Sequence, residues 1–121
     1  MYILVIEDDK FLADLIAQKL KQENIEAKIV VDGQEGLQSI EEKRPDLILL
    51  DLILPGMDGF ELISALKKNP KTDKIPIIIL SNLSDKENIE RAMKLGARDF
   101  IIKADLGLSA IIDRIKNICR V

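Results

Sequence analysis

The chain has 121 residues, enough for one domain, and it is 47% hydrophobic and 32% charged, a balance that excludes both a disordered chain and a membrane-embedded one. A net charge of −3 and an aromatic content of 3%, with no tryptophan, argue against general nucleic-acid binding and base stacking. The chain has no histidine, so a metal site would need a hard cation held by oxygen ligands.

The N-terminus and the cysteine content predict a cytoplasmic protein. The first nine residues lack a cationic region and a cleavage site, and they run directly into a strand pattern, so no signal peptide is expected. Cys119 is the single cysteine, which excludes an internal disulfide and indicates a reducing compartment.

The first third of the chain predicts two strands and two helices. An apolar run at 2–6 indicates a strand that ends at three acidic residues. The apolar residues that follow are spaced for one face of a helix: Phe11, Leu12, Leu15, Ile16 and Leu20. A second strand is expected at 27–31, after which Asp32 and Gly33 turn the chain into a helix that stops before Pro45.

The segment 45–59 contains the central strand of the predicted fold. Five of the six residues at 47–52 are large and apolar, a run typical of a strand buried on both faces of a parallel sheet, and the sixth is Asp51. A carboxylate at the end of such a strand costs free energy unless it is solvated, paired or bound to a metal. Proline and glycine residues then break the chain, which places one acid at the carboxyl end of a central strand.

A third helix and a fourth strand come next. Asp58 and Glu61 have the spacing of a capping box, and they precede apolar residues at helical spacing, Phe60, Leu62, Ile63 and Leu66. The polar segment 69–74 predicts a loop. The residues at 77–80 predict a strand that ends in Ser81.

The last third of the chain predicts a fourth helix, a fifth strand and a fifth helix. Ser84 and Glu87 have capping-box spacing and open a helix with the apolar residues Ile89, Ala92, Met93 and Leu95, with Gly96 suited to its end. A fifth strand at 99–102 ends at Lys103. The final helical stripe comprises Leu108, Ile111, Ile112, Ile115, Ile118 and Cys119.

Five strands that alternate with five helices predict an α/β fold, a doubly wound three-layer sandwich around a parallel sheet. The carboxyl ends of parallel strands share one edge, so the polar residues there should meet in one cleft: Glu7, Asp8, Asp51, Ser81 and Lys103. Clustered carboxylates repel one another unless a cation such as Mg²⁺ intervenes. One carboxylate would remain free as a nucleophile, and carboxylates form acyl phosphates. Lysine and serine can then bind the phosphoryl oxygens.

Several segments together resemble the receiver domain of two-component response regulators, over essentially the whole chain. The matching motifs lie at 3–9, 45–59, 76–81 and 96–100, together with Lys103. The resemblance implies a flavodoxin-like (βα)5 fold with a five-stranded parallel sheet. It also implies a single receiver domain at 1–121, with no output domain in this chain.

The resemblance further implies the roles of the site residues. Asp51 would accept a phosphoryl group, with Mg²⁺ or Mn²⁺ as the cofactor, and Lys103 would pair with the acceptor or its phosphate. Asp8 and Asp51 would bind the metal directly, Glu7 through water, and Ile53 through its backbone carbonyl. Ser81 would swing towards the phosphate, and Phe100, at the position of the family's switch aromatic, would turn inward.

By the same resemblance, the phosphoryl donor would be a phosphohistidine on a sensor histidine kinase or a histidine phosphotransfer protein. The fourth helix, the fifth strand and the fifth helix would form the face that binds a downstream protein or a second copy of the chain. No direct nucleic-acid contact and no membrane contact are expected. The domain would not be an enzyme in the usual sense, but a phosphoacceptor that assists its own phosphorylation and slow dephosphorylation.

Four positions depart from the family's usual pattern or modify it. Ala104 stands where a proline with a cis bond is usual, and a cis bond before a non-proline residue costs about 3 kcal/mol. Asn82 replaces a small residue and would narrow access to the phosphate. Ile53 and Leu83 flank the path of an attacking water, and neither side chain can hold water by hydrogen bonding, which predicts a long-lived phosphoprotein.

One other interpretation stays open on sequence alone, and two more are disfavoured by the motifs. A receiver-like scaffold that does not cycle phosphate is compatible with Ala104 and Asn82. A haloacid-dehalogenase-type phosphatase uses similar groups, but its nucleophile opens an Asp-x-Asp motif on the first strand, and here Asp51 follows the third. A flavin-binding module needs a phosphate loop after the first strand, where three acids stand instead.

Overall fold

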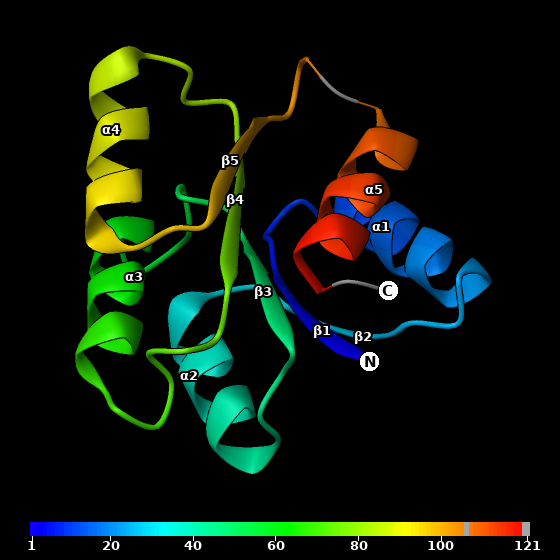
Figure 1. Cartoon of the computed structure of the whole chain (residues 1–121), viewed down its shortest axis with the longest axis horizontal. Helices are drawn as coiled ribbons and strands as arrows, with labels where there is room; N and C mark the ends of the chain where they lie inside the picture. The colour runs from blue at the N-terminus through cyan, green and yellow to red at the C-terminus, as the bar shows by residue number, and fades with distance from the viewer. Residues whose placement is uncertain (106, 120–121) are drawn as a thin grey trace.

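The computed structural model describes residues 1–105 and 107–119, and it has the predicted alternation of strands and helices (Figure 1). The elements in chain order are β1 (Tyr2–Ile6), α1 (Lys10–Gln22), β2 (Glu26–Val30), α2 (Gly33–Glu42), β3 (Leu47–Leu50), α3 (Gly59–Lys68), β4 (Ile77–Ser81), α4 (Lys86–Leu95), β5 (Asp99–Ile102) and α5 (Leu108–Cys119). The prediction of a five-stranded α/β sandwich is therefore confirmed. Among the described residues, no helix is both long and apolar enough to cross a bilayer.

All five strands pair in parallel in the order β2-β1-β3-β4-β5, the order of a doubly wound sheet. Ile6 pairs with both Val30 and Leu50, and Ser81 pairs with Ile102. This register aligns the carboxyl ends of β1, β3, β4 and β5, which carry the predicted polar residues. At one end of this order, β2 pairs with β1 alone among the strands of residues 1–105 and 107–119, and it exposes Glu26.

Two apolar cores lie on opposite faces of the sheet. Leu4 and Ile6 belong to the core under α2, α3 and α4, whereas Ile3 and Val5 belong to the core under α1 and α5. Successive side chains of a strand point to opposite faces, so β1 is apolar throughout because both its faces are covered. The same holds for β3 and explains why the sequence shows continuous apolar runs there.

Aspartates begin four of the helices. Asp9, Asp32 and Asp58 occupy the N-cap positions of α1, α2 and α3, and each accepts a hydrogen bond from a backbone N–H of its helix. At α2 a second hydrogen bond supports the cap, since Glu35 accepts from the amide of Val31, the residue before Asp32 (3.0 Å). The capping box predicted from Ser84 is wrong, because α4 begins after Asp85, whose side chain makes no cap hydrogen bond.

Two apolar side chains expected on helix core faces are exposed. Phe11 lies in the first turn of α1 and is 76% exposed, and Met93 on α4 is 42% exposed. Both occupy the margin of an apolar stripe, where helical spacing alone does not fix which way a side chain faces. Cys119 is half-buried against the core under α1 and α5, and burial raises the pKa of its thiol.

The turn between β3 and α3 depends on a glycine. A Cβ atom on Gly59 would lie 2.5 Å from Leu52 Cα and 2.7 Å from the Leu52 carbonyl oxygen, which accepts the Gly59 amide hydrogen. Contacts this short force backbone movement. The close approach therefore fixes the start of α3 directly beyond Asp51 and Leu52.

We expect Gly59→Ala to lower the free energy of unfolding by about 2 kcal/mol, because the added methyl group overlaps the Leu52 backbone. Gly107→Ala is the matched control, since nothing lies within 4 Å of its Cβ position, and it should change stability by less than about 0.5 kcal/mol. Urea unfolding of the two variants would measure the difference. Equal stability of the two variants would contradict the packing argument.

Candidate functional site

Three carboxylates converge at the carboxyl edge of the sheet. Glu7 and Asp8 directly follow β1, and Asp51 directly follows β3, its neighbour in the sheet. One carboxylate oxygen from each residue lies within 4.8 Å of the other two. Glu7 and Asp51 are buried, whereas Asp8 is exposed. The sequence prediction that these acids meet in one place is confirmed by this geometry.

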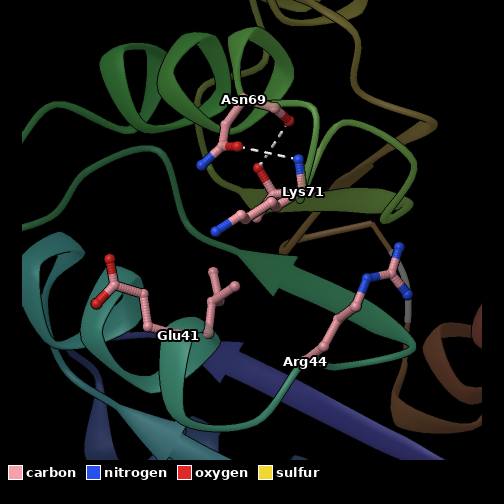
Figure 2. A pocket seen from close by; sticks show the side chains of 6 residues that line it. Glu41, Arg44, Asn69 and Lys71 are labelled. Carbon is pink, nitrogen blue, oxygen red and sulfur yellow. Dashed lines mark hydrogen bonds between the residues drawn. The ribbon is translucent and has the colours of Figure 1, made fainter.

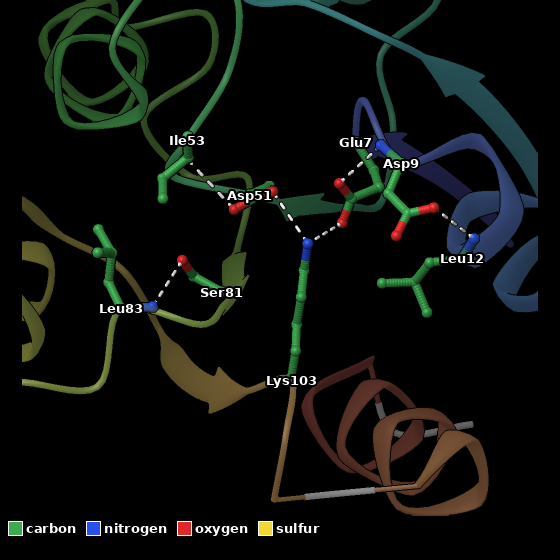
Figure 3. A network of polar contacts seen from close by, with 8 residues as sticks. All are labelled: Glu7, Asp9, Leu12, Asp51, Ile53, Ser81, Leu83 and Lys103. Atoms are coloured by element: carbon green, nitrogen blue, oxygen red, sulfur yellow. Dashed lines mark hydrogen bonds and ion pairs between the residues drawn. The ribbon is translucent and has the colours of Figure 1, made fainter.

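Lys103 extends from the end of β5 to this cluster and pairs with two of its acids (Figure 3). Its ammonium nitrogen lies 2.7 Å from Glu7 Oε1 and 3.0 Å from Asp51 Oδ2. The pairing with Asp51 was predicted from the sequence, and the pairing with Glu7 was not. One long side chain thus connects the ends of β1, β3 and β5.

Burial governs the electrostatics of Glu7. Burial raises the pKa of its carboxyl to about 7, with the Asp51 charge as a smaller contribution, against the lowering effect of the Lys103 ammonium and the Asp9 amide. Burial also disfavours the charged form of Lys103, but the hydrogen bonds and charges of Glu7 and Asp51 outweigh it and raise the lysine pKa. The two acids therefore hold the lysine in its cationic form.

Backbone amides orient two of the carboxylates. The Asp9 amide donates to Glu7 Oε2 (3.1 Å), and the Ile53 amide donates to Asp51 Oδ1 (3.2 Å). Asp51 is thus held at one oxygen by the loop after β3 and at the other by Lys103 (Figure 3). An ionised carboxylate oxygen has more than one lone pair, so each can still bind a further ligand.

The two switch residues predicted from the resemblance lie near one another in the sheet. Ser81 is the last residue of β4 and is fully buried, and its hydroxyl accepts a hydrogen bond from the Leu83 amide (3.3 Å). Phe100 lies in the adjacent β5 and is half-buried against the core under α2, α3 and α4. In this structure the Ser81 hydroxyl is therefore engaged with the loop that leads to α4.

The residues that depart from or modify the family pattern lie in the loops that follow β3, β4 and β5. The Lys103–Ala104 peptide is trans, and Lys103 still reaches Asp51. Ile53 is 58% exposed at the rim of the site, and Leu83 is half-buried beside Ser81. Asn82 is exposed. The side chains expected to flank an incoming water therefore present apolar surface.

The donor set fits a hard divalent cation. Glu7, Asp8 and Asp51 supply carboxylate oxygens, the ligand type that Mg²⁺ and Mn²⁺ prefer, and one of these acids is exposed while two are buried. Burial raises the pKa of Glu7 even with Lys103 beside it, so the ionised carboxylate would be stabilised by further positive charge. A divalent cation bound by these oxygens would supply that charge.

A separate cavity of about 450 Å³ lies at the opposite edge of the sheet, between the end of α2 and the turn after α3 (Figure 2). Its polar groups hold that turn: Asn69 Oδ1 accepts from the Lys71 amide (2.9 Å), and the Thr72 hydroxyl donates to the Leu66 carbonyl (2.6 Å). The lining residues are Ile40, Glu41, Arg44, Asn69, Lys71 and Thr72. None of the predicted site residues contributes to this cavity.

Asp9 has a role that the sequence analysis did not identify. It was grouped with the acids at the end of β1, but its Oδ1 accepts from the Leu12 amide (3.2 Å) and caps α1. Its position three residues before Leu12, at the start of an apolar helical stripe, is the sequence signal for an N-cap. The two acids available to a ligand after β1 are thus Glu7 and Asp8.

Comparisons with known proteins find similarity over most of the chain. The family model described as the response regulator receiver domain matches residues 3–116. The DNA-binding response regulator MtrA of Mycobacterium tuberculosis is 36% identical over 101 residues, which are 84% of this chain and 43% of that protein. The chain therefore spans less than half the length of that relative.

Solved structures of similar proteins have the same fold. The BeF3-activated N-terminal receiver domain of RstA from Klebsiella pneumoniae has a TM-score of 0.91 and 29% identity, with 100% of both chains covered. The phosphorylated cyanobacterial phytochrome response regulator RcpA has a TM-score of 0.83 and 32% identity, with 97% of this chain and 89% of that one covered.

We expect Lys103→Met to lower the free energy of unfolding by about 3 kcal/mol, because it leaves two buried carboxylates without their cation. Lys116→Met, which removes the more exposed pair with Glu23, should cost much less. Adding Mg²⁺ should restore part of the loss in Lys103→Met only. Urea unfolding with and without Mg²⁺ measures both effects, and equal losses in the two variants would contradict the central role of Lys103.

Proposed function

The chain belongs to the response regulator receiver domain family, and on this premise we propose that it accepts a phosphoryl group on Asp51 from a phosphohistidine of a partner protein. The observation that carries the proposal is the contact of the Lys103 ammonium with Asp51, 3.0 Å apart, inside a cluster of three acids. A nucleophilic carboxylate, a fixed cation and a nearby hydroxyl are the groups that phosphoryl transfer to an aspartate requires.

The chain's own residues position the reacting groups. An Asp51 oxygen forms a bond to phosphorus while the phosphorus–nitrogen bond of the donor histidine breaks, and the leaving imidazole nitrogen takes a proton from solvent. The Ile53 amide and Lys103 hold the carboxylate in place for this attack. Lys103 then neutralises charge on the transferred group, since it already lies beside the acceptor.

Glu7, Asp8 and Asp51 are the residues that would hold Mg²⁺ or Mn²⁺, together with the Ile53 backbone carbonyl. The bound cation would neutralise oxygens of the phosphoryl group and reduce the repulsion between the incoming phosphate and the acids. Asp8, as the exposed member, leaves the cluster accessible from solvent. The all-oxygen donor set supports this assignment.

Phosphorylation would act as a switch through Ser81 and Phe100. The Ser81 hydroxyl would leave the Leu83 amide and bind the phosphoryl group, and Phe100 would turn inward into the space vacated near it. The face formed by α4, β5 and α5 would then change its affinity for a downstream protein or for a second copy of the chain. Phe100 is half-buried at this face, which supports its role.

We place this activity in the cytoplasm, with residues 1–121 acting as one receiver domain and assisting their own phosphorylation and slow dephosphorylation. The donor would be a sensor histidine kinase or a histidine phosphotransfer protein. The net charge of −3 and the low aromatic content support the absence of direct nucleic-acid contact. The reach of Lys103 to Asp51 despite Ala104 supports phosphate cycling over a scaffold role.

Incubation with acetyl phosphate and Mg²⁺ should add one phosphoryl group to the wild type and none to Asp51→Asn, because the amide is a poor nucleophile. Intact-mass spectrometry measures the gain. Removal of Mg²⁺ with a chelator should reduce labelling of the wild type strongly. An unlabelled wild type with confirmed Mg²⁺ binding would favour the scaffold interpretation instead.

The phosphorylated protein should lose its phosphoryl group slowly, since Ile53 and Leu83 cannot hold an attacking water by hydrogen bonding. Ile53→Asn should speed the loss several-fold, while Met93→Asn, the same kind of change at an exposed residue of α4, should not. The decay of the phosphorylated mass after removal of the donor gives the rates. Rapid loss from the wild type would show that the apolar flanks do not protect the phosphate.

A further inference from the structure

A methionine side chain connects the loop between β3 and α3 to the start of α2. Met57 lies in this loop, is half-buried and packs against the core under α2, α3 and α4. A Cβ atom on Gly33, the first residue of α2, would lie 2.9 Å from Met57 Sδ and 3.0 Å from Met57 Cβ. The lack of a side chain at Gly33 therefore provides the space that the Met57 side chain occupies.

The loop that contains Met57 also orients the candidate phosphoacceptor. The Ile53 amide donates to Asp51 Oδ1 (3.2 Å), so the start of the loop fixes one oxygen of the acceptor (Figure 3). The two residues before Met57, Pro55 and Gly56, are exposed, and the Met57 side chain is the next point at which the loop packs against the core. Small displacements of reacting groups reduce reaction rates strongly, so the contact of Met57 with α2 bears on the acceptor.

Solvent reaches Met57 through a hollow in the surface. A cavity of about 360 Å³ lies between the start of α2 and the loop, and its lining includes Met57, Asp32, Gln34 and Glu61. The thioether of methionine is oxidised to a sulfoxide by hydroperoxides, which are small relative to a hollow of this volume. The structure thus gives an oxidant a path to a sulfur atom that holds the acceptor loop in place.

The surroundings of Met57 do not suit a sulfoxide. On the Gly33 side, the close approach of the backbone leaves no room for an added oxygen atom. On the cavity side, the partly negative sulfoxide oxygen would lie among the carboxylates of Asp32 and Glu61. Oxidation also makes polar a side chain that packs against the apolar core. All three effects favour displacement of the oxidised side chain from Gly33.

We propose that Met57 is a reversible oxidation site through which hydroperoxides slow phosphoryl transfer to Asp51. One oxygen atom passes to sulfur as the O–O bond breaks, so the thioether is oxidised and the hydroperoxide is reduced to water or an alcohol. Methionine sulfoxide reductases reverse the step with a dithiol as reductant, which leaves as a disulfide with one water. The effect on phosphoryl transfer rests on the function proposed above for Asp51, whereas the oxidation of Met57 does not.

Peptide mass spectrometry after mild treatment with hydrogen peroxide tests the oxidation. Met57 should gain one oxygen in the folded protein, as should the more exposed Met93. Because Gly33 blocks one side of the thioether, Met57 should form mainly one sulfoxide epimer, which only one of the two epimer-specific reductases reverses, whereas Met93 should form both. An unmodified Met57 beside a fully oxidised Met93, or a mixture of epimers at Met57, would overturn the proposal.

Phosphorylation by acetyl phosphate with Mg²⁺ tests the consequence. The oxidised wild type should gain its phosphoryl group severalfold more slowly than the reduced protein, and the reductases should restore the rate. Met57→Leu keeps an apolar side chain of similar volume without sulfur, so its rate should not respond to peroxide, whereas Met93→Leu should respond as the wild type does. All three proteins contain Cys119, so oxidation of its thiol does not account for a difference between them. Equal sensitivity of Met57→Leu and the wild type would overturn the role of Met57.

A substitution at Gly33 displaces Met57 without oxidation. The methyl group of Gly33→Ala would lie 2.9 Å from Met57 Sδ, so this variant should be phosphorylated slowly even in the absence of peroxide. In a Met57→Ala background the sulfur is absent, so Gly33→Ala should slow the reaction little further. A wild-type rate for Gly33→Ala would show that the position of Met57 does not matter to the acceptor.

The two parts of the proposal fail independently of the proposed function. A reduced wild type that takes up no phosphoryl group would refute the function proposed for Asp51, while the peptide masses would still report whether Met57 is oxidised. Complete oxidation of Met57 with an unchanged phosphorylation rate would overturn the regulatory part.

Discussion

The ion pairs of Lys103 are the interaction on which the rest of the site depends. Glu7 is 2% exposed, and a carboxylate so deeply buried is unfavourable without a cation beside it. One ammonium serves both Glu7 and Asp51, and it comes from the end of β5, whereas the acids follow β1 and β3. The charges of these three residues therefore balance one another across the sheet edge. A change of charge at Asp51 alters the electrostatic interactions at the ends of β1, β3 and β5 together.

Most of the fold and most of the site could be predicted from the sequence, for physical reasons. β1 and β3 are covered on both faces, so they appear as unbroken apolar runs, and a parallel sheet brings their carboxyl ends together. The Glu7–Lys103 pair could not be foreseen, because it depends on how far a long side chain reaches across the edge. Likewise, spacing alone could not decide whether Ser84 or Asp85 precedes the first turn of α4. Nor could it predict that the Phe11 side chain is exposed to solvent.

The helices differ in how many caps and buried residues hold them in place, and the difference between α3 and α4 matches their positions relative to the site. α3 starts at a glycine pressed against Leu52, with a side-chain cap and five buried residues, so the loop that orients Asp51 is anchored firmly. α4 follows the loop after Ser81 with no side-chain cap and one buried residue. A rigid element thus lies beside the acceptor, and a weakly held one lies beyond the hydroxyl that would respond to it.

The exposure of β2 has a consequence for how copies of the chain meet one another. A strand with only one hydrogen-bonded neighbour presents unpaired backbone groups that another strand could join. Here Glu26 pairs with Lys43, and Lys28 lies near Glu42, so charged side chains from α2 and the residue after it stand along that strand. Bringing a second sheet edge against them would strip water from these charges, so the lateral growth of sheets from molecule to molecule is disfavoured at this edge.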